Sequence, residues 1–408
     1  MEEWKEYKLG DLIDFISGGT PNKNTPKFWD GDIPWISAKT MYVDFVSTSD
    51  LFISQEGLEA GSKLAPKGTI LLLTRGSGLF NTIPICKVVS PVAFNQDVKC
   101  LYSKNEDLIS NDFLFYWLKG NEQTITNILE TTSIGAGKID TKRFLDLPIN
   151  LPSLVEQDKL VKIASSLFEK IKINNAINDN LEHQAQALFK SWFVDFEPFR
   201  DQSFVESELG MIPDGWRVGT LNNICTTNRR KLKGQITRPI KYLDTGNITK
   251  NKIEILQSLN PNIDTIPSRA RRCVTEGDIV YSTVRPNQEH YGFLINPPSD
   301  LIVSTGFCVI TSNWSVYRYY IYQYLIQDSI IATLQAIAEQ QVSTYPSLNA
   351  SDIENLLVVI PPIEVAEKYA KIVLPLYLKM EENQSESHRL SQLRDTLLPK
   401  LMSGEIKL

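Results

Sequence analysis

The chain has 408 residues, of which 42% are hydrophobic and 22% are charged, and its formal net charge is −6. These values are ordinary for a globular protein of two or three domains. No apolar run approaches the roughly eighteen residues that span a bilayer, and the charged N-terminus lacks the apolar core of a secretion signal. The five scattered cysteines form no metal-binding pair, which favours a cytoplasmic protein and argues against structural zinc.

The charge is distributed unevenly along the chain. Residues 1–150 are acidic on balance, whereas residues 211–360 carry a small positive net charge. The overall negative charge argues weakly against nucleic-acid binding, but local basic clusters still permit it.

The first 152 residues are predicted to form one mixed α/β domain. Strands are expected at residues 33–37 and 69–74, and the second is apolar enough to be buried. A helix begins at residues 112–118, and residues 134–152 return through a loop and a strand.

A long helix is predicted from Ser153 to Phe193. Pro152 cannot join a helix interior, and Ser153 with Glu156 three residues later forms a capping box. Leucine and asparagine then recur every seven residues, which predicts a seam that lies along another helix. The predicted seam residues are Leu160, Leu167, Asn174, Leu181 and Leu188.

The partner helix is predicted within the same chain, at residues 362–408, where the seam recurs 209 residues later. Its members are Leu376, Asn383, Leu390 and Leu397. If the helices are antiparallel, the facing pairs are Leu160 with Leu397, Leu167 with Leu390, and Asn174 with Asn383. A polar pair in a seam costs stability but fixes the register. Chance spacing of leucines is the alternative explanation.

Residues 204–361 repeat the plan of the first domain. Gly277–Arg285 corresponds to Gly68–Arg75, and Ile360-Pro361 corresponds to Leu151-Pro152. The sequence therefore predicts an α+β fold, a tandem pseudo-two-fold repeat of two mixed α/β domains joined by two long antiparallel, coiled-coil-like helices. The predicted segments are residues 1–152, 153–203, 204–361 and 362–408.

Such a duplicated chain presents two similar surfaces on a helical spacer. Forty helical residues span about 60 Å, and DNA repeats every ~34 Å. Two unequal modules on this spacer would suit a bipartite, asymmetric DNA site.

Several segments resemble the specificity subunit of type I restriction–modification enzymes, over almost the whole chain. They are Trp4–Leu12, Ser17–Pro21 (SGGTP), Gly31–Trp35 (GDIPW), Leu151–Gln157 (LPSLVEQ) and Leu397–Glu405 (LLPKLMSGE). The start of the second helix, Ile360–Ala366, departs from the pattern because it lacks the Glu-Gln pair.

The resemblance implies a function for each part. Each globular domain would be a target-recognition domain that reads half of a bipartite site in double-stranded DNA. The paired helices would set the spacing and dock two modification (methyltransferase) subunits, which restriction (nuclease/translocase) subunits join. S-adenosylmethionine, ATP and Mg are then expected on those partners, with no cofactor and no catalysis on this chain.

The sequence offers little chemistry of its own. Asn296–Ser299 approaches the Asn-Pro-Pro-aromatic loop of amino-methyltransferases, but its fourth residue is serine. Residues 133–138 are glycine-rich but lack phosphate-loop spacing, and the three histidines lie far apart. Two alternatives remain: a coiled-coil assembly scaffold without base readout, and a fused restriction or methylation enzyme. Sequence-selective DNA binding tests the first, and methyl transfer by the isolated chain tests the second.

Basic and amide side chains in predicted loops are the candidate DNA contacts. Arg75 and Arg285 each follow a buried strand, and arginine suits guanine as Asn287 and Gln288 suit adenine. A solvated cationic face or a structural salt bridge is the alternative for each basic residue. In the first domain the candidates are Lys39, Arg75, Ser77 and Lys138. In the second they are Arg229, Arg230, Lys231, Lys233, Arg271, Arg285, Asn287, Gln288, Gln340, Gln341 and Ser343.

Two further expectations concern loops and helix faces. Residues 340–345 align with residues 133–138, which predicts a polar loop near DNA in both halves. Apolar residues outside the seam are expected to be exposed for docking by additional helices. These are Leu154, Phe168, Ile173, Phe189 and Phe193.

Overall fold

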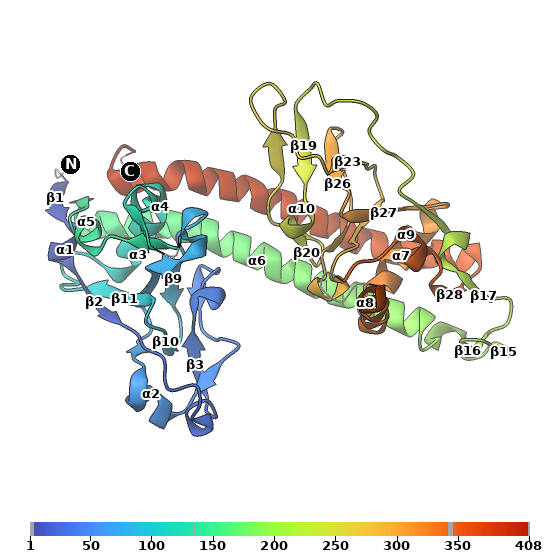
Figure 1. Ribbon diagram of the computed structural model, residues 1–408, viewed down its shortest axis with the longest axis horizontal. Helices are drawn as coiled ribbons and strands as arrows, with labels where there is room; N and C mark the ends of the chain where they lie inside the picture. The colour runs from blue at the N-terminus through green and yellow to red at the C-terminus, as the bar shows by residue number, and fades with distance from the viewer. Residues whose placement is uncertain (1–3, 134, 342–345, 407–408) are drawn as a thin grey trace. The chain divides into compact units, whose positions relative to one another are not determined.

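The structure is a computed structural model that describes residues 4–133, 135–341 and 346–406. The chain divides into two compact units, unit 1 (Met1–Lys172 with His388–Leu408) and unit 2 (Ile173–Ser387). Two long helices, α6 (Leu154–Phe193) and α10 (Ile363–Ser403), each contribute residues to both units (Figure 1). The predicted pair of long helices is therefore confirmed.

Unit 1 holds the first α/β domain, whose strands form four small sheets. A pair joins β1 (Lys5–Lys8) to β14 (Pro148–Leu151), and a five-stranded sheet has the order β2 (Ile13–Ser17), β11 (Val98–Ser103), β7 (Ile70–Leu73), β9 (Ile85–Val88), β4 (Phe45–Val46). A four-stranded sheet has the order β5 (Phe52–Ile53), β3 (Ile33–Ile36), β10 (Val92–Phe94), β6 (Leu64–Ala65). A three-stranded sheet has the order β12 (Leu129–Thr131), β13 (Gly137–Ile139), β8 (Arg75–Gly76).

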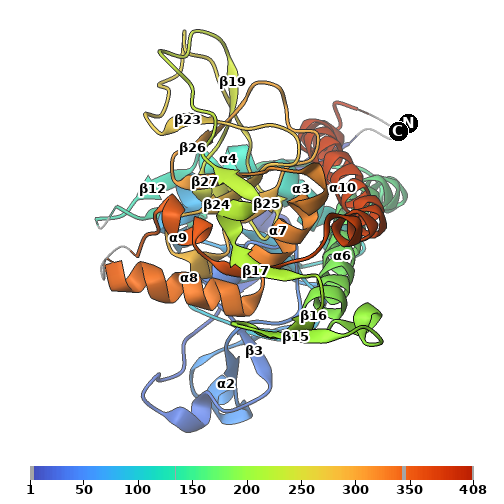
Figure 2. The ribbon, with the colours of Figure 1, turned by 90° about the vertical axis from the view of Figure 1, so that its right-hand side faces the viewer.

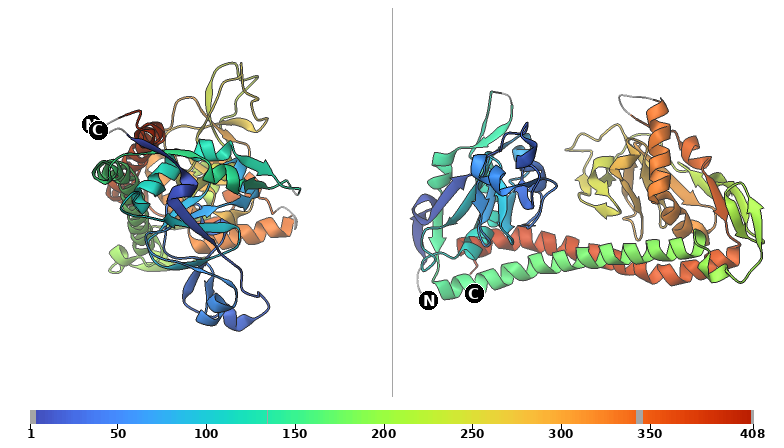
Figure 3. Two further views of the ribbon diagram at one scale, coloured as in Figure 1. Left: turned by 90° about the vertical axis from the view of Figure 1, so that its left-hand side faces the viewer. Right: turned by 90° about the horizontal axis from the view of Figure 1, so that it is seen from below.

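The core of unit 1 joins these sheets to the long helices. Every residue of β7 is buried, as its unbroken apolar sequence predicts. The same core contains α3 (Asn111–Gly120), Leu160 of α6 and Leu398 of α10. Figure 3 shows the strands of unit 1, in blue, on one side of the two helices. The remaining helices are α1 (Leu9–Leu12), α2 (Gln55–Gly61), α4 (Glu122–Thr126) and α5 (Thr141–Leu145).

Unit 2 also contains small sheets packed with the long helices, but the number and order of their strands differ from those of unit 1. The pair β17 (Arg217–Thr220) and β28 (Leu357–Ile360) corresponds to β1 and β14. One four-stranded sheet has the order β18 (Cys225–Thr227), β27 (Phe307–Ser312), β24 (Ile279–Ser282), β25 (Tyr291–Phe293). A second four-stranded sheet has the order β22 (Gln257–Leu259), β19 (Ile240–Leu243), β26 (Leu301–Ser304), β23 (Ala270–Cys273). Two further pairs are β15 (Phe204–Ser207) with β16 (Gly210–Pro213) and β20 (Ile248–Thr249) with β21 (Lys252–Ile253).

The shorter α-helices in the described part of unit 2 are α7 (Arg318–Leu325), α8 (Asp328–Gln341) and α9 (Ala350–Glu354). Figure 2 shows them beside the strands β24 and β27. Aromatic rings join α6, α7 and α10, because the ring of Phe193 lies 4.8 Å from those of both Tyr320 and Tyr369. This packing anchors the long helices in the second domain.

The buried positions of α6 and α10 repeat at the offset that the sequence predicts. Leu160 and Tyr369 are both fully buried, as are Ala164 and Val373, each pair 209 residues apart. Each helix thus offers equivalent positions to its own globular domain. The tandem repeat is therefore present in the packing as well as in the sequence.

The apolar residues expected to be exposed on α6 are mostly buried. Phe168, Phe189 and Phe193 are only 3%, 2% and 6% exposed, because they pack into the cores of the globular domains of this same chain. The prediction that further helices cover these three residues is wrong. Leu154 and Ile173 are exposed, at 38% and 52%.

Asparagine side chains join α6 to α10 within unit 2. The Nδ2 of Asn174 donates to the carbonyl oxygen of Asn383 over 3.4 Å and to Glu386 over 2.8 Å. The amide–amide hydrogen bond instead runs from Asn383 Nδ2 to Asn178 Oδ1, over 2.8 Å, and Asn178 donates to the carbonyl of Met380. The helices are antiparallel here, as predicted, but the amide that meets Asn383 lies one turn further along α6.

The leucines of the predicted seam are less central than the pattern suggests. Leu397 is half-buried against the unit 1 core that contains Leu160, whereas Leu167 and Leu390 lie outside the buried clusters of the described residues. The guanidinium of Arg394 instead stacks on the ring of Phe168, 5.1 Å from its centroid. In unit 2, the residues half-buried against the core are Leu181, Leu188 and Leu376.

The Glu-Gln pair at the start of α6 connects the helix to the first domain. The side chain of Gln157 is buried, accepts from the backbone N–H of Ser110 and donates to the carbonyl of Leu108. Glu156 accepts from the indole N–H of Trp4 over 3.3 Å. At the start of α10, the hydroxyl of Tyr317 donates to the carbonyl of Pro361, which explains how that helix is anchored without the pair.

Among the residues that the structure describes, no helix is both long and apolar enough to cross a membrane.

Candidate nucleic-acid interface

In unit 1, two of the predicted contacts lie on neighbouring strands. Arg75 of β8 and Lys138 of β13 are directly paired in the antiparallel register, and both side chains are exposed. β13 packs closely against the 3-10 helix Ser77–Phe80 that follows β8, because Gly137 has no side chain: a Cβ there would lie 3.1 Å from the Cβ of Leu79. The sheet thus holds two cations side by side on a short ribbon.

Backbone hydrogen bonds bring Lys39 and Ser77 to the same edge of the domain. In the turn that follows β10, the carbonyl oxygen of Asp97 accepts a hydrogen bond from the N–H of Thr74 over 2.8 Å. In the same turn, the N–H of Asn95 donates to the carbonyl oxygen of Ile36 over 3.0 Å. The ends of β7 and β3 are therefore tied to one turn. Lys39 follows β3, Ser77 follows β8, and both are exposed.

A polar hollow of about 390 Å³ lies beside this ribbon. Its lining consists of Arg75, Glu130, Thr131, Thr132, Ser133 and Lys138. Of the predicted flexible loop at residues 133–138, Gly137 and Lys138 belong to β13 and pair with β12, and Ile134 lies outside the described residues. Gly135 has φ +77°, a backbone conformation that residues with a side chain rarely adopt. Hydroxyls and cations exposed at a hairpin can reach phosphates and base edges.

In unit 2, the structure joins two basic clusters that are forty residues apart in sequence. Residues 230–232 lie antiparallel to β23: Leu232 N–H donates to Arg271 O over 2.8 Å, and Cys273 N–H donates to Arg230 O over 3.2 Å. The side chain of Arg271 also donates to Gly234 O over 2.8 Å. We call the exposed cations on this edge, Arg229, Lys231, Lys233 and Arg269, the β23 basic edge.

Arg230 has a different role from its neighbours. Its guanidinium donates to the carboxylate of Asp278 over 3.1 Å, and the side chain of Asp278 is only 1% exposed. Thr275 and Thr311 also donate to this carboxylate. The structural salt bridge, and not the phosphate contact, is therefore the role that the geometry supports for Arg230.

This ion pair gives a stability prediction. The substitution Asp278→Ala removes the buried carboxylate that accepts from Arg230, Thr275 and Thr311. The Arg230 side chain is 39% exposed, so the expected cost is that of leaving hydrogen-bonding groups unpaired, about 1–3 kcal/mol. We expect a loss of that order in urea unfolding monitored by tyrosine fluorescence. Asp146→Ala is the control, since the Asp146–Lys8 pair is exposed and its loss should leave the midpoint unchanged. Equal midpoints for Asp278→Ala and wild type would contradict the assignment.

Arg285, Asn287 and Gln288 form a tight turn against α8. Arg285 has φ +48°, a strained conformation for a non-glycine residue. The backbone N–H of Asn287 donates to the side chain of Gln335 over 3.1 Å, so α8 supports the turn. Asn287 and Gln288 are exposed, as their predicted role requires.

The correspondence between Arg75 and Arg285 needs a correction. Val284 pairs with Ser347 in unit 2 as Arg75 pairs with Lys138 in unit 1, and both members differ by 209. The structural counterpart of Arg75 is therefore Val284, and Arg285 lies one residue further along the turn.

The predicted second polar loop, residues 340–345, begins within helix α8. Gln340 is exposed but lies in the last turn of α8, so it belongs to a helix and not to a loop. Gln341 is the last residue of that helix, and Ser343 lies outside the described residues.

Two exposed aromatic residues were missed by the sequence analysis. Tyr42 is 59% exposed, and its hydroxyl lies against Gly78; Phe80 is 46% exposed beside Gly137. Both lie next to the ribbon that carries Arg75. Nothing in the sequence distinguishes them from core aromatics, because only the fold shows that they face outward.

The remaining motifs are structural. Asn296 has φ +47° and donates its backbone N–H to Glu276, so Asn296–Ser299 is a turn between β25 and β26. Within the described ranges, no three His, Cys, Asp or Glu side chains are grouped as a metal site would require.

Comparisons with known proteins agree with this arrangement. The family model described as "Type I restriction modification DNA specificity domain" matches residues 1–183 and 213–391, one copy in each half. The specificity subunit of the MjaIX type I restriction enzyme from Methanocaldococcus jannaschii is 28% identical over 427 residues, covering 100% of this chain and 94% of that protein. That of the HindI enzyme from Haemophilus influenzae is 25% identical over 480 residues, covering 100% of both.

A solved structure shares the fold. The S subunit of the type I restriction–modification system from M. genitalium matches with a TM-score of 0.57 at 15% identity, covering 98% of this chain and 96% of that one. With two matched domains and relatives aligned along the whole length, the chain belongs to the family of type I restriction–modification specificity subunits.

Proposed function

We propose that each globular domain reads one half of a bipartite, asymmetric site in double-stranded DNA. The observation that carries the proposal is that each unit holds exposed cations on a paired strand edge: Arg75 and Lys138 in unit 1, and the β23 basic edge in unit 2. The two edges differ in sequence and in supporting elements, so the half-sites should differ as well. Rigid strand edges suit base readout because they hold long side chains in place.

The roles proposed for the long helices and for the other subunits of the complex rest on family membership. In this proposal α6 and α10 set the gap between the half-sites and dock two modification subunits, to which restriction subunits add. S-adenosylmethionine, ATP and Mg would act on those subunits, and this chain would bind no cofactor and catalyse no step. The asparagine contacts between α6 and α10 support the spacing role, because they fix the register of the two helices.

The basic edge of unit 2 gives the test. The triple substitution Arg229→Ala, Lys231→Ala and Lys233→Ala should weaken DNA binding by the complex with its modification subunit. Loss of three phosphate contacts should reduce the slope of log affinity against log salt by about 0.9 for each contact. Fluorescence anisotropy over a salt series measures both quantities.

A control separates DNA contact from loss of charge alone. Lys5→Ala, Lys8→Ala and Lys104→Ala removes the same charge from exposed positions of unit 1 that are neither on the long helices nor among the candidate DNA contacts, and should leave the salt slope unchanged. Size-exclusion chromatography verifies that both variants assemble. An unchanged slope for the β23 variant would favour an assembly scaffold that does not read DNA.

A further inference from the structure

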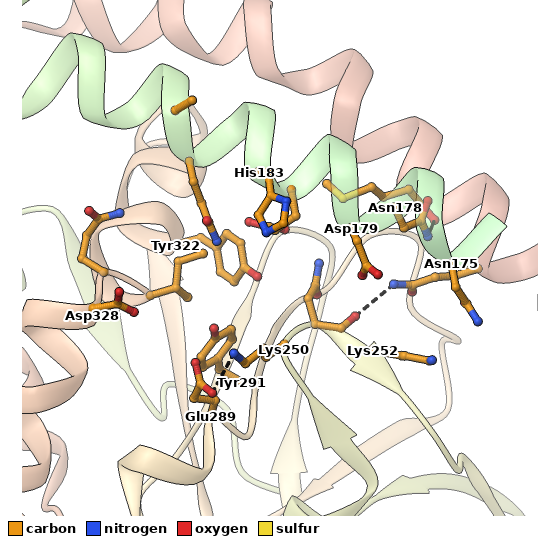
Figure 4. Close-up of a pocket in the computed structure, with 18 of the residues that line it drawn as sticks. Asn175, Asn178, Asp179, His183, Lys250, Lys252, Glu289, Tyr291, Tyr322 and Asp328 are labelled. Carbon is orange, nitrogen blue, oxygen red and sulfur yellow. Dashed lines mark hydrogen bonds and ion pairs between the residues drawn. The ribbon is translucent and has the colours of Figure 1, made fainter. Parts of the chain in front are cut away.

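A cavity of about 670 Å³ lies within unit 2, away from the β23 basic edge (Figure 4). One wall is α6, including Asp179, Glu182 and His183, and the opposite wall includes Tyr291 and Tyr322. The start of α8 and the segment 250–252 close the sides. No step of the proposed DNA readout uses this cavity.

Its wall contains a carboxylate whose hydrogen bonding is incomplete. Gln323 donates to Glu182 Oε1 over 2.7 Å, but Glu182 Oε2 is buried and finds no partner among the described residues. The hydroxyl of Tyr322, which lines the same cavity, is also buried without a partner in the described chain. Burial raises the pKa of Glu182 to about 7. An unpaired buried acceptor is costly, so this site is suited to a hydrogen-bond donor that the chain does not supply.

The repeat shows that the fold does not require this polar group. The residue 209 positions after Glu182 is Ser391, and the residue 209 positions before Tyr377, which accepts from Gln323, is Phe168. In unit 1, Phe168 packs on Tyr116 with ring centroids 5.3 Å apart, giving an apolar contact. Because serine replaces Glu182 and phenylalanine replaces Tyr377 at the equivalent positions, the carboxylate and its polar surroundings are a property of unit 2 alone.

The other charges around the cavity favour a cationic ligand. The ammonium of Lys250 is held by Glu289 over 2.8 Å, and that of Lys190 by Asp195 over 2.5 Å. Asp179 and Asp328 are exposed at the rim, and Figure 4 shows them on opposite sides of the cavity, with His183 and Tyr322 between them. Lys252 is the remaining cation of the lining.

We propose that this cavity binds a linear polyamine of the spermidine class, whose ammonium groups donate to the carboxylates of Asp179, Glu182 and Asp328. Separated carboxylates match the separated charges of such a ligand, and charge-assisted hydrogen bonds are the strong ones. The methylene chain would lie along the cavity wall that α6 forms, between the carboxylates of Asp179 and Asp328. The site is independent of the DNA-reading surfaces.

Isothermal titration calorimetry of the full chain with spermidine tests the proposal. We expect saturable binding of one spermidine per chain, and magnesium chloride at matched ionic strength should not displace it. Glu182→Gln preserves the shape and the hydrogen bond to Gln323 but removes the charge, and should weaken binding about tenfold or more. Asp328→Asn, an exposed change that leaves the core intact, should weaken it less.

Glu169→Gln is the matched control, because it removes one carboxylate from an exposed position of α6 that lies in unit 1. This variant should bind spermidine as wild type does. Circular dichroism verifies that every variant is folded. Three results would each overturn the proposal: no saturable binding, displacement by magnesium, or equal affinity for Glu182→Gln and wild type.

Discussion

Inserting one heptad of helix-forming residues after Lys172 in α6, together with one after Ser387 in α10, should lengthen the gap in the recognised DNA by about three base pairs. Seven helical residues add about 10.5 Å at 1.5 Å each, and successive base pairs lie about 3.4 Å apart. Both insertions fall at the boundary between the units. A heptad also keeps the same face of each helix toward its partner.

Methylome sequencing of a host that expresses this variant with its modification subunit would read the gap directly. A heptad in α6 alone is the control, since it displaces Asn174 from the residues of α10 that it contacts and should abolish methylation. Four residues in α6 alone should fail in the same way or change the gap. If the double insertion is methylated with the original gap, the helices do not set the spacing.

If unit 1 reads one half-site as proposed, the double substitution Arg75→Ala and Lys138→Ala should relax that half-site and leave the other half-site intact. A side chain that contacts a base edge contributes about 1–3 kcal/mol of discrimination. Two such losses lower the preference for the correct half-site by roughly thirtyfold or more. Competition binding against single-base variants of the site measures this preference.

Its control removes two charges from a neighbouring element. Lys142→Ala and Arg143→Ala changes the exposed face of α5 and should leave the specificity unchanged. If the Arg75 and Lys138 variant weakens binding to all sequences equally, these residues contact phosphates and not bases. That result would move base reading in unit 1 to other residues, with Tyr42 and Phe80 the nearest exposed candidates.

The regular elements were predictable because their signals are local. Proline before Ser153 and the seven-residue spacing placed α6 within one residue of its observed start. The unbroken apolar run at residues 69–74 predicted the buried strand β7. Of the α10 positions that the offset of 209 predicted as the seam, Asn383 is buried, whereas Leu376, Leu390 and Leu397 are only half-buried. The helical period and an unbroken apolar run can both be recognised from residues that are neighbours in sequence, without knowledge of distant contacts.

The roles of individual charges were not predictable. Arg229 and Arg230 are adjacent in sequence, yet only the fold places Asp278 beside Arg230 and leaves Arg229 exposed. The offset of 209 likewise holds through this strand, so Val284, and not Arg285, is the counterpart of Arg75. Strand pairing decides both results, and a shift of one residue reverses the direction of every side chain.

The sequence by itself determined that this chain is a duplicated pair of α/β domains with two long antiparallel helices, because repetition and periodicity are properties of residue order. Only the tertiary structure decided what those helices touch. Phe168 and Phe193 have the exposed pattern of a docking face, but the domains of the chain itself bury them. Glu182 looks like an ordinary surface glutamate until Gln323 and Tyr322 enclose it. Burial depends on which distant segments meet, and that information lies in the fold.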